Sequence, residues 1–159
     1  MAIIDEYTRE CLAIRVAPSI PASAVVGVLE WLFLTRGVPK HIRSDNGPEF
    51  VARAVCQWLK ESGCHSLFIT PGSPRENGYI ESFFDKLRDE CLNRKVFRNG
   101  WEAQAIVETW RQEYNPSKKD RPHSSLDYLT PARFARRYYE DKQAEEAAQP
   151  GEMAGTLSL

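Results

Sequence analysis

Residues 42–50 read Ile-Arg-Ser-Asp-Asn-Gly-Pro-Glu-Phe, and this stretch decides the fold that the sequence predicts. Its apolar, β-prone beginning stops at Asp45, where Asp-Asn-Gly is a turn sequence because Asn and Gly tolerate positive φ angles. A helical pattern follows from about Pro48. The stretch therefore predicts a strand, a turn and a helix, with the carboxylate of Asp45 at the end of the strand.

A second stretch has the same order. After a β-like run, residues 71–78 hold two Pro, two Gly and one Asn, the composition of a mobile loop, and Glu81 follows at the start of an amphipathic helix. Thirty-five residues separate Asp45 from Glu81. Carboxylate oxygens are the ligands that hard cations prefer, and two such cations can clamp the attacking and leaving oxygens of a phosphodiester. Nucleic-acid chemistry is therefore the leading hypothesis.

Each segment alone is weak support for this hypothesis. Asp-Asn-Gly is a common turn, and a single Glu on an amphipathic helix is most often a solvated residue. The combination is more specific, because both carboxylates stand in the same setting between a β-like run and a helix.

The rest of the sequence describes an ordinary globular domain. A chain of 159 residues with 42% hydrophobic residues fits one domain. Acidic Asp5 and Glu6 stand where a signal peptide would be apolar, and the apolar stretch 25–34 is too short to span a bilayer. The four cysteines have neither metal-site nor disulfide spacing, so we expect reduced, mostly buried thiols in a cytoplasmic protein.

The charge is unevenly distributed along the chain. Residues 1–139 carry 20 basic against 17 acidic side chains, a net charge of +3, whereas residues 140–159 carry one basic against five acidic, a net charge of −4. We therefore expect a core over residues 1–139 and an acidic, flexible tail over residues 140–159. A surplus of three positive charges does not by itself indicate DNA binding.

Strand and helix patterns alternate, which indicates an α/β or α+β domain. Thr130 and Pro131 form a typical helix start, a hydroxyl cap followed by Pro at the first helical position. Upstream of that helix, we expect a hairpin over residues 1–16, strands over 40–44 and 64–70, and helices over about 23–36, 48–62, 80–91 and 100–114.

Three separated segments, together with the hairpin sequence at residues 5–14, resemble a known family. The segments are IRSDNGPEF at residues 42–50, FITPGSPRENGYIESFFDKLRDECLN at 68–93 and RPHSSLDYLTPARFA at 121–135. They are similar to the catalytic core of bacterial insertion-sequence transposases, the branch that is similar to retroviral integrases. The resemblance covers roughly residues 1–135.

The resemblance implies a ribonuclease H-like fold, in which helices flank a mixed sheet. It also implies an Asp, Asp, Glu triad that binds two divalent ions, Mg²⁺ or Mn²⁺. The last two members of the triad are thirty-five residues apart in the family, which matches Asp45 and Glu81 as catalytic, metal-binding residues. A metal-bound water or a 3′-hydroxyl would attack a phosphodiester in line, first nicking element ends and then joining them to another strand.

The first Asp of the family has no counterpart in this sequence. In relatives it lies on the central strand of the sheet, ahead of the hairpin, whereas this chain begins at Met1 part-way along the next strand. Asp5 matches the hairpin turn, so we do not expect it to be catalytic. The resemblance therefore predicts an N-terminally truncated core without its first, central strand and without one of the three carboxylates.

Other polar residues have more than one interpretation. Asn46 and Gly47 are expected to shape the turn, and Glu49 is expected to complement the dipole of the following helix. Lys86 is as easily a solvated residue as a DNA contact, and residues 121–124 are as easily a helix cap or a docking segment. With these alternatives open, the candidate DNA-binding residues are Ser73, Arg75, Asn77, Lys86, Arg121 and His123.

Three functions remain open at this point. The chain is part of a DNA strand-transfer enzyme that needs the missing strand, a catalytically inactive fragment that binds DNA or intact transposase, or a decayed remnant. A complete ribonuclease H-like nuclease fits less well, because residues 121–135 resemble transposases. The family implies DNA as partner, a homo-oligomer or an association with full-length transposase, and a nucleoid-associated place in the bacterial cytoplasm, with no membrane and no small-molecule substrate.

Overall fold

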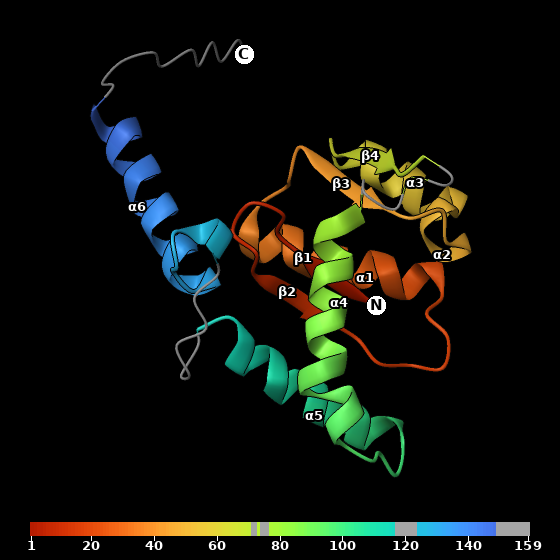
Figure 1. Cartoon of the computed structure of the whole chain (residues 1–159). Coiled ribbons are helices and arrows are strands. Elements are labelled where there is room, and N and C mark those ends of the chain that lie inside the picture. Colours follow the sequence, from red (N-terminus) through yellow and green to blue (C-terminus); the bar gives the residue numbers. More distant parts are fainter. Residues whose placement is uncertain (71–72, 74–76, 117–123, 149–159) are drawn as a thin grey trace.

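The computed structural model describes residues 1–70, 73, 77–116 and 124–148 of the chain. Strands and helices alternate along these residues, as expected for an α/β domain (Figure 1). The strands are β1 Ala2–Ile4, β2 Cys11–Ile14, β3 His41–Ser44 and β4 His65–Phe68. The helices are α1 Ala22–Arg36, α2 Pro48–Val51, α3 Arg53–Glu61, α4 Gly78–Glu90, α5 Gly100–Tyr114 and α6 Pro131–Ala148, with 3₁₀ turns η2 Leu92–Arg94 and η3 Ser124–Leu126.

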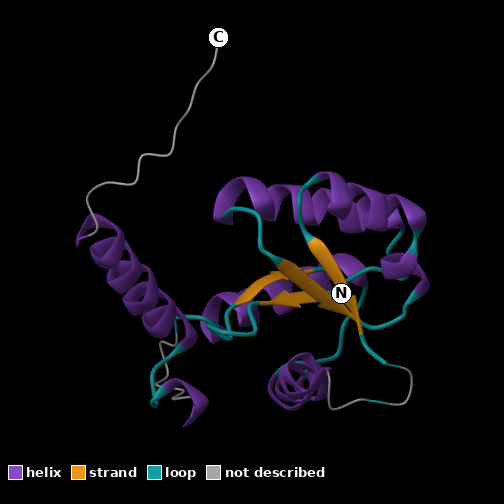
Figure 2. Ribbon diagram, turned by 90° about the horizontal axis from the view of Figure 1, so that it is seen from above, coloured by secondary structure: helices purple, strands orange, loops and turns teal. Residues whose placement is uncertain are grey.

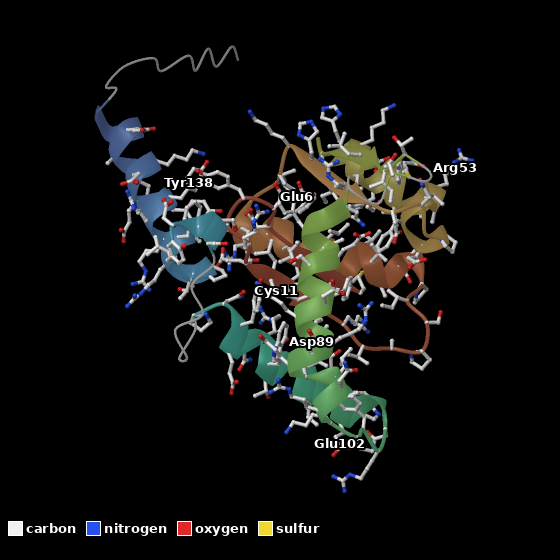
Figure 3. The ribbon with its side chains drawn as sticks, in the orientation of Figure 1. Glu6, Cys11, Arg53, Asp89, Glu102 and Tyr138 are labelled. Atoms are coloured by element: carbon white, nitrogen blue, oxygen red, sulfur yellow. The ribbon has the colours of Figure 1, made fainter. Side chains whose placement is uncertain are left out.

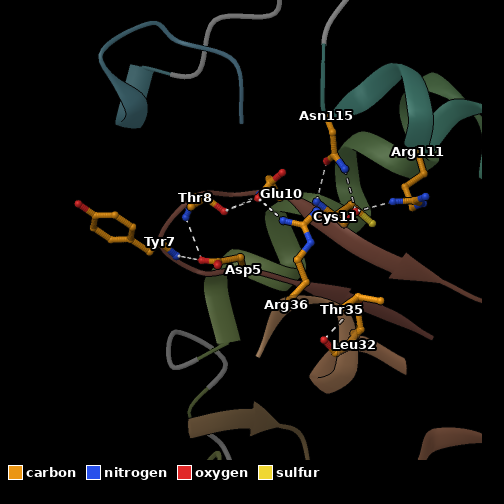
Figure 4. A network of polar contacts seen from close by, with 10 residues as sticks. All are labelled: Asp5, Tyr7, Thr8, Glu10, Cys11, Leu32, Thr35, Arg36, Arg111 and Asn115. Atoms are coloured by element: carbon orange, nitrogen blue, oxygen red, sulfur yellow. Dashed lines mark hydrogen bonds and ion pairs between the residues drawn. The ribbon is translucent and has the colours of Figure 1, made fainter. Parts of the chain in front are cut away.

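Strands β1 and β2 form the antiparallel hairpin that the sequence predicts. Its turn is closed by Asp5, whose Oδ1 accepts hydrogen bonds from the backbone N–H groups of Tyr7 at 2.8 Å and Thr8 at 2.9 Å (Figure 4). An Asp side chain that bonds its own backbone in this way stabilises a tight reversal. The carboxylate of Asp5 is therefore a turn-forming group, as expected.

The outer edge of β2 is closed by side chains at α5. Asn115, which caps α5, accepts from the Cys11 N–H at 2.8 Å and donates to the Cys11 carbonyl at 2.9 Å (Figure 4). Gln104 accepts from the Val16 N–H at 2.7 Å and donates to the Ile14 carbonyl at 3.2 Å. The two amides take the place of a neighbouring strand, so this edge needs no further chain to satisfy these backbone groups.

Strands β3 and β4 are parallel, from His41 opposite His65 to Ser44 opposite Phe68. A parallel pair needs a crossover, and here α2 and α3 provide it. The prediction of one continuous helix over residues 48–62 is wrong, because Ala52 has an extended backbone (φ −54°, ψ 132°) between the two helices. The apolar periodicity continues across this break and therefore gave no sign of it.

The two strand pairs do not form one sheet. Among the described residues, β1 pairs only with β2, and β3 pairs only with β4. Figure 2 shows the strands in the middle of the domain with helices on both sides.

Two apolar clusters cover the opposite faces of the strand layer. The first packs β1 and β2 against α4 and α5, and the second packs α1 and α3 against β1 and β3. Such two-sided cover is typical of sheets whose strands carry apolar residues on both faces. The buried members of the first cluster are Cys11, Phe83, Leu87, Cys91, Val107, Trp110 and Tyr114; those of the second are Val25, Leu29, Val55, Leu59 and Cys64.

The helix ends largely follow the sequence signals. α1 ends before Gly37, whose φ of 85° is a left-handed conformation that favours glycine. The Thr130 Oγ1 accepts from the Arg133 N–H at 3.3 Å at the start of α6. This helix continues to Ala148, past residue 140 where the sequence predicts the acidic tail to begin, and residues 149–159 lie outside the described part.

The four cysteines are free thiols, as expected, and three of them are buried. Burial raises the pKa of the Cys11 thiol to about 12, so this thiol stays protonated and unreactive at neutral pH. None of the helices described is both long enough and apolar enough to cross a membrane.

Replacement of Asn115 by Ala tests the closed edge of β2. The Cys11 N–H loses its partner, and an unsatisfied, partly buried donor costs about 1–3 kcal/mol of unfolding free energy. Urea denaturation measures the loss. Gln112→Ala is the matched control, because its amide bonds Glu108 on the exposed surface and should cost less than about 0.5 kcal/mol. Equal losses in the two variants would contradict this role for Asn115.

Candidate functional site

Asp45 lies directly after β3, at the carboxyl end of that strand. Its Oδ1 accepts a hydrogen bond from the Gly47 N–H at 2.9 Å, while the side chain as a whole stays exposed. The side chain of Asn46 donates to the carbonyl of Ile69 at 3.0 Å, which ties the turn to the residue after β4. The turn thus holds the Asp45 carboxylate in a defined place at the end of the parallel strand pair.

Gly47 lies between two carboxylates. A Cβ atom at this position would be 2.9 Å from Asp45 Oδ1 and 3.1 Å from Glu49 Oε2, so a side chain here would displace at least one of them. Glu49 lies in the first turn of α2, as expected, but its carboxylate also approaches the Asp45 turn. From the sequence we expected only the dipole role of Glu49, and its short spacing from Asp45 across the Gly-Pro turn was the signal for this approach.

Glu81 lies in the first turn of α4 and is exposed. The opposite side of the helix is anchored in the core by Phe83 and Leu87, which are 3% and 4% exposed. Residues two and six positions later on a helix lie on other faces, so burial of these two side chains leaves Glu81 outside the core. The apolar stripe predicted from the sequence therefore orients this carboxylate.

Asp45 and Glu81 line one cavity of about 1520 Å³. Glu49 and Asn77, the residue before α4, line it too. Among the described residues, no ion pair involves Asp45, Glu49 or Glu81, although Glu49 interacts electrostatically with the Met1 amino group, whose pKa burial lowers. The carboxylates at the strand end and at the helix start thus line one open cavity.

Asp45 and Glu81 carry the kind of oxygen ligand that hard divalent cations prefer. Among the described residues, no three or more His, Cys, Asp or Glu side chains are grouped so that they could hold a metal ion. Exposed carboxylate oxygens nevertheless suit hard divalent cations, and Mg²⁺ takes one or two protein carboxylates together with water and phosphate oxygens. Asp45 and Glu81 therefore fit part of such a coordination shell.

Residues of the hairpin turn line the same cavity, but their carboxylates are engaged in other contacts. Asp5 lines it, but its Oδ1 is occupied by the two backbone bonds of the turn. Glu6 pairs with Arg43 of β3, Oε1 to Nε, at 3.0 Å. The carboxylates of the hairpin turn thus stabilise the wall of the cavity.

The candidate DNA-binding residues do not lie together. Asn77 lines the cavity of Asp45 and Glu81, and Ser73 is half-buried. Lys86 lines a different cavity, of about 350 Å³, beside Arg9 and Tyr79. The candidates outside the described residues are Arg75, Arg121 and His123.

Comparison with known proteins identifies the family. Two sequence profiles, both described as an integrase core domain, match residues 1–74 and 62–131. The chain is 41% identical over 138 residues to an uncharacterised 39.2 kDa protein of insertion element IS476 from Xanthomonas euvesicatoria. It is 40% identical over 149 residues to an uncharacterised 31.7 kDa protein of IS407 from Burkholderia multivorans.

These matches cover 87% and 94% of this chain but only 39% and 53% of the two relatives. A transposase for insertion sequence element IS629 from Shigella sonnei is 29% identical over 140 residues, which are 86% of this chain and 46% of that protein. The chain therefore spans about half the length of these relatives, or less.

A solved structure shows the same fold. The catalytic core domain of BIV integrase superposes with a TM-score of 0.63 at 20% identity, and the match covers 91% of this chain and 88% of that one. The ribonuclease H-like fold that the sequence predicts is thus confirmed. With both profiles and the insertion-element relatives in agreement, the chain belongs to the integrase core domain family, in the branch of bacterial insertion-element transposases.

Proposed function

We propose that the chain is the catalytic-core portion of a transposase that cleaves and joins DNA strands with divalent cations, Mg²⁺ or Mn²⁺. One observation carries the proposal: Asp45 and Glu81, far apart in sequence, line the same open cavity as exposed carboxylates. The matching profiles and the transposase of IS629 support the same reaction class.

The chain's own part in this chemistry is to place negative charge. The turn after β3 holds the Asp45 carboxylate, and the anchored helix α4 holds that of Glu81. Two cations bound there would stabilise the attacking and leaving oxygens of a phosphodiester. Without cations, the carboxylates repel a phosphate group, so DNA and metal are expected to bind together.

DNA is the proposed substrate, both as element ends and as target. Asn77 lies on the cavity and Ser73 belongs to the segment that leads to it, so these two are the described residues we assign to DNA contact. Binding should be directed mainly at phosphates and weaken with salt. Work on two DNA ends requires at least two copies, which we place in the bacterial cytoplasm at the nucleoid.

A second candidate is a catalytically inactive fragment that binds DNA or intact transposase. Two observations favour it: the strands form two separate sheets, and the described residues provide no group of three metal-binding side chains. The two candidates differ in what residues 1–159 do on their own.

Residues 1–159 alone are expected to bind DNA without cutting it. The two site carboxylates supply too few ligands to hold two cations firmly. The measurement is nicking of labelled element-end DNA by purified protein in Mg²⁺ and in Mn²⁺, with EDTA as control. Nicking that depends on metal and is lost in Glu81→Gln would remove the inactive-fragment candidate.

Glu81→Gln tests the active site in a longer protein that contains this chain. The substitution keeps the shape and removes the charge, so strand joining in Mg²⁺ should fall by about 100-fold or more, with DNA binding retained. Asp89→Asn is the matched control, because Asp89 is exposed near the other end of α4 and away from the cavity (Figure 3). Joining activity unchanged in Glu81→Gln would exclude Glu81 from the site.

Gly47→Ala tests the geometry of the turn. The added Cβ would contact Asp45 Oδ1 and Glu49 Oε2, so we expect Mn²⁺ affinity, measured by water-proton relaxation, to fall about tenfold. Gly27→Ala is the control, because nothing lies within 4 Å of a Cβ there. In the interior of α1 that change should leave Mn²⁺ affinity unaltered and stabilise the fold by about 0.5–1 kcal/mol. The proposed placement fails if both variants bind Mn²⁺ equally.

A further inference from the structure

A second cavity, separate from that of Asp45 and Glu81, lies where distant segments of the chain meet. Its volume is about 350 Å³, and it is lined by residues of the hairpin, of α4, of the end of α5 and of η3. The basic and serine residues of this lining are Arg9, Ser82, Lys86, Ser124 and Ser125. The proposed DNA chemistry makes no use of this cavity.

The two cavities differ in the sign of the charges that line them. Arg9 and Lys86 are the charged residues of the second cavity, and no described Asp or Glu lines it. The carboxylates that line the first cavity are those of Asp5, Glu6, Asp45, Glu49 and Glu81. Cationic groups and hydroxyls donate hydrogen bonds, and phosphate oxygens accept them. The second cavity therefore has the donors that an anion needs, whereas the first suits cations.

The guanidinium of Arg9 is held in place by two contacts. It donates to the carbonyl of Glu6, and its central carbon lies 3.6 Å from the centroid of the Tyr79 ring. The attraction between a cation and the face of an aromatic ring keeps the group over Tyr79. No ion pair between described residues involves Arg9. Since a guanidinium has five N–H donors, one bond to a carbonyl leaves donors for a ligand.

Three serine hydroxyls add to these donors. Ser82 lies four residues before Lys86 on α4, a spacing that places two side chains on the same face of a helix. Ser124 and Ser125 belong to η3, which the buried side chain of Leu126 anchors in the core. All three serines are exposed, so a large ligand can reach them. Serine hydroxyls are common donors to the phosphate oxygens of DNA.

The second cavity lies on the other side of α4 from Glu81. From this helix, the first cavity is lined by Ile80, Glu81 and Phe84, and the second by Tyr79, Ser82, Phe83 and Lys86. At about 3.6 residues per turn, these two sets project from nearly opposite sides of the helix. A helix with its side chains is about 10–12 Å across, so an anion in the second cavity is distinct from a group that reacts beside Glu81.

We propose that the second cavity binds one phosphate group of a DNA backbone, at a nucleotide other than the one that reacts. Arg9 and Lys86 would offset its charge, and the serine hydroxyls would donate to its oxygens. Contacts of this kind fix the position of DNA and read no sequence. The inference rests on the proposed DNA substrate and adds a site to the contacts of Ser73 and Asn77.

Binding of residues 1–159 to a short DNA duplex in EDTA, followed by fluorescence anisotropy, tests this contact without catalysis. Arg9→Gln should weaken binding about tenfold, to a similar extent for unrelated sequences. It should also reduce the slope of log K against log salt concentration by about one, the contribution of one phosphate contact. Arg15→Gln is the matched control, because Arg15 is exposed just past β2 of the same hairpin and lines neither cavity. The control should leave the affinity within about twofold and the slope unaltered.

A second pair of variants leaves the hairpin intact. Ser125→Asp places a carboxylate in the cavity, where it would repel a phosphate, so DNA affinity should fall about tenfold or more. Asn93→Asp adds the same charge at an exposed position outside both cavities and should change the affinity less than about twofold. Circular dichroism of each variant confirms the fold before titration.

Inorganic phosphate is the direct probe of the cavity. Titrated in place of chloride at constant ionic strength, it should shift the backbone amide NMR signals of Arg9, Ser82 and Ser125 in the unaltered chain. In Arg9→Gln the same titration should shift the signals of the two serines less than half as far.

The proposal is overturned if the unaltered chain does not bind DNA, or if either variant of the cavity binds DNA as its control does. Shifts with inorganic phosphate but unaltered DNA binding in both variants would also overturn it, because the cavity would then take free phosphate. All these measurements are made in EDTA, whereas Glu81→Gln is judged by joining in Mg²⁺. The two proposals therefore fail separately.

Discussion

The pairing of strand-edge backbone groups is the constraint on which the rest of this structure depends. Each N–H and C=O group removed from water needs a partner, and both strand pairing and side-chain amides provide such partners here. β1 and β2 pair with each other, and the amides of Asn115 and Gln104 close the outer edge of β2. Within the part of the chain that the structure describes, β1 and β3 do not pair with each other, so the strands form two sheets.

The two residues of the candidate site lie in different halves of the domain. Asp45 belongs to the sheet of β3 and β4, whereas Glu81 belongs to a helix packed on β1 and β2. Among the described residues, no backbone ladder connects the two halves; side-chain packing on α1 and the pair between Arg43 and Glu6 connect them. A part-exposed ion pair contributes at most about 1 kcal/mol. The separation of the two carboxylates is therefore controlled mainly by apolar packing.

Local structure could be predicted from the sequence, whereas the positions of distant residues relative to one another could not. The hairpin closed by Asp5, the turn at Asp45 and the apolar stripe of α4 all followed from turn residues and periodicity. The break at Ala52 was missed because apolar spacing continues through it, and Lys86 proved to border a separate cavity. The approach of Glu49 to Asp45 depends on how a turn and a short helix meet, which periodicity does not describe.

The bond from Asn46 to the carbonyl of Ile69 has a mechanical consequence. It fastens the chain that leaves β4, at the beginning of the connection to α4, beside the turn that carries Asp45. The Ile69 N–H also donates to the carbonyl of Ser44 in β3, at 3.2 Å, so Ile69 is bonded on both sides to the segment that carries Asp45. A change in the path of the chain after β4 would therefore shift the turn that presents the Asp45 carboxylate.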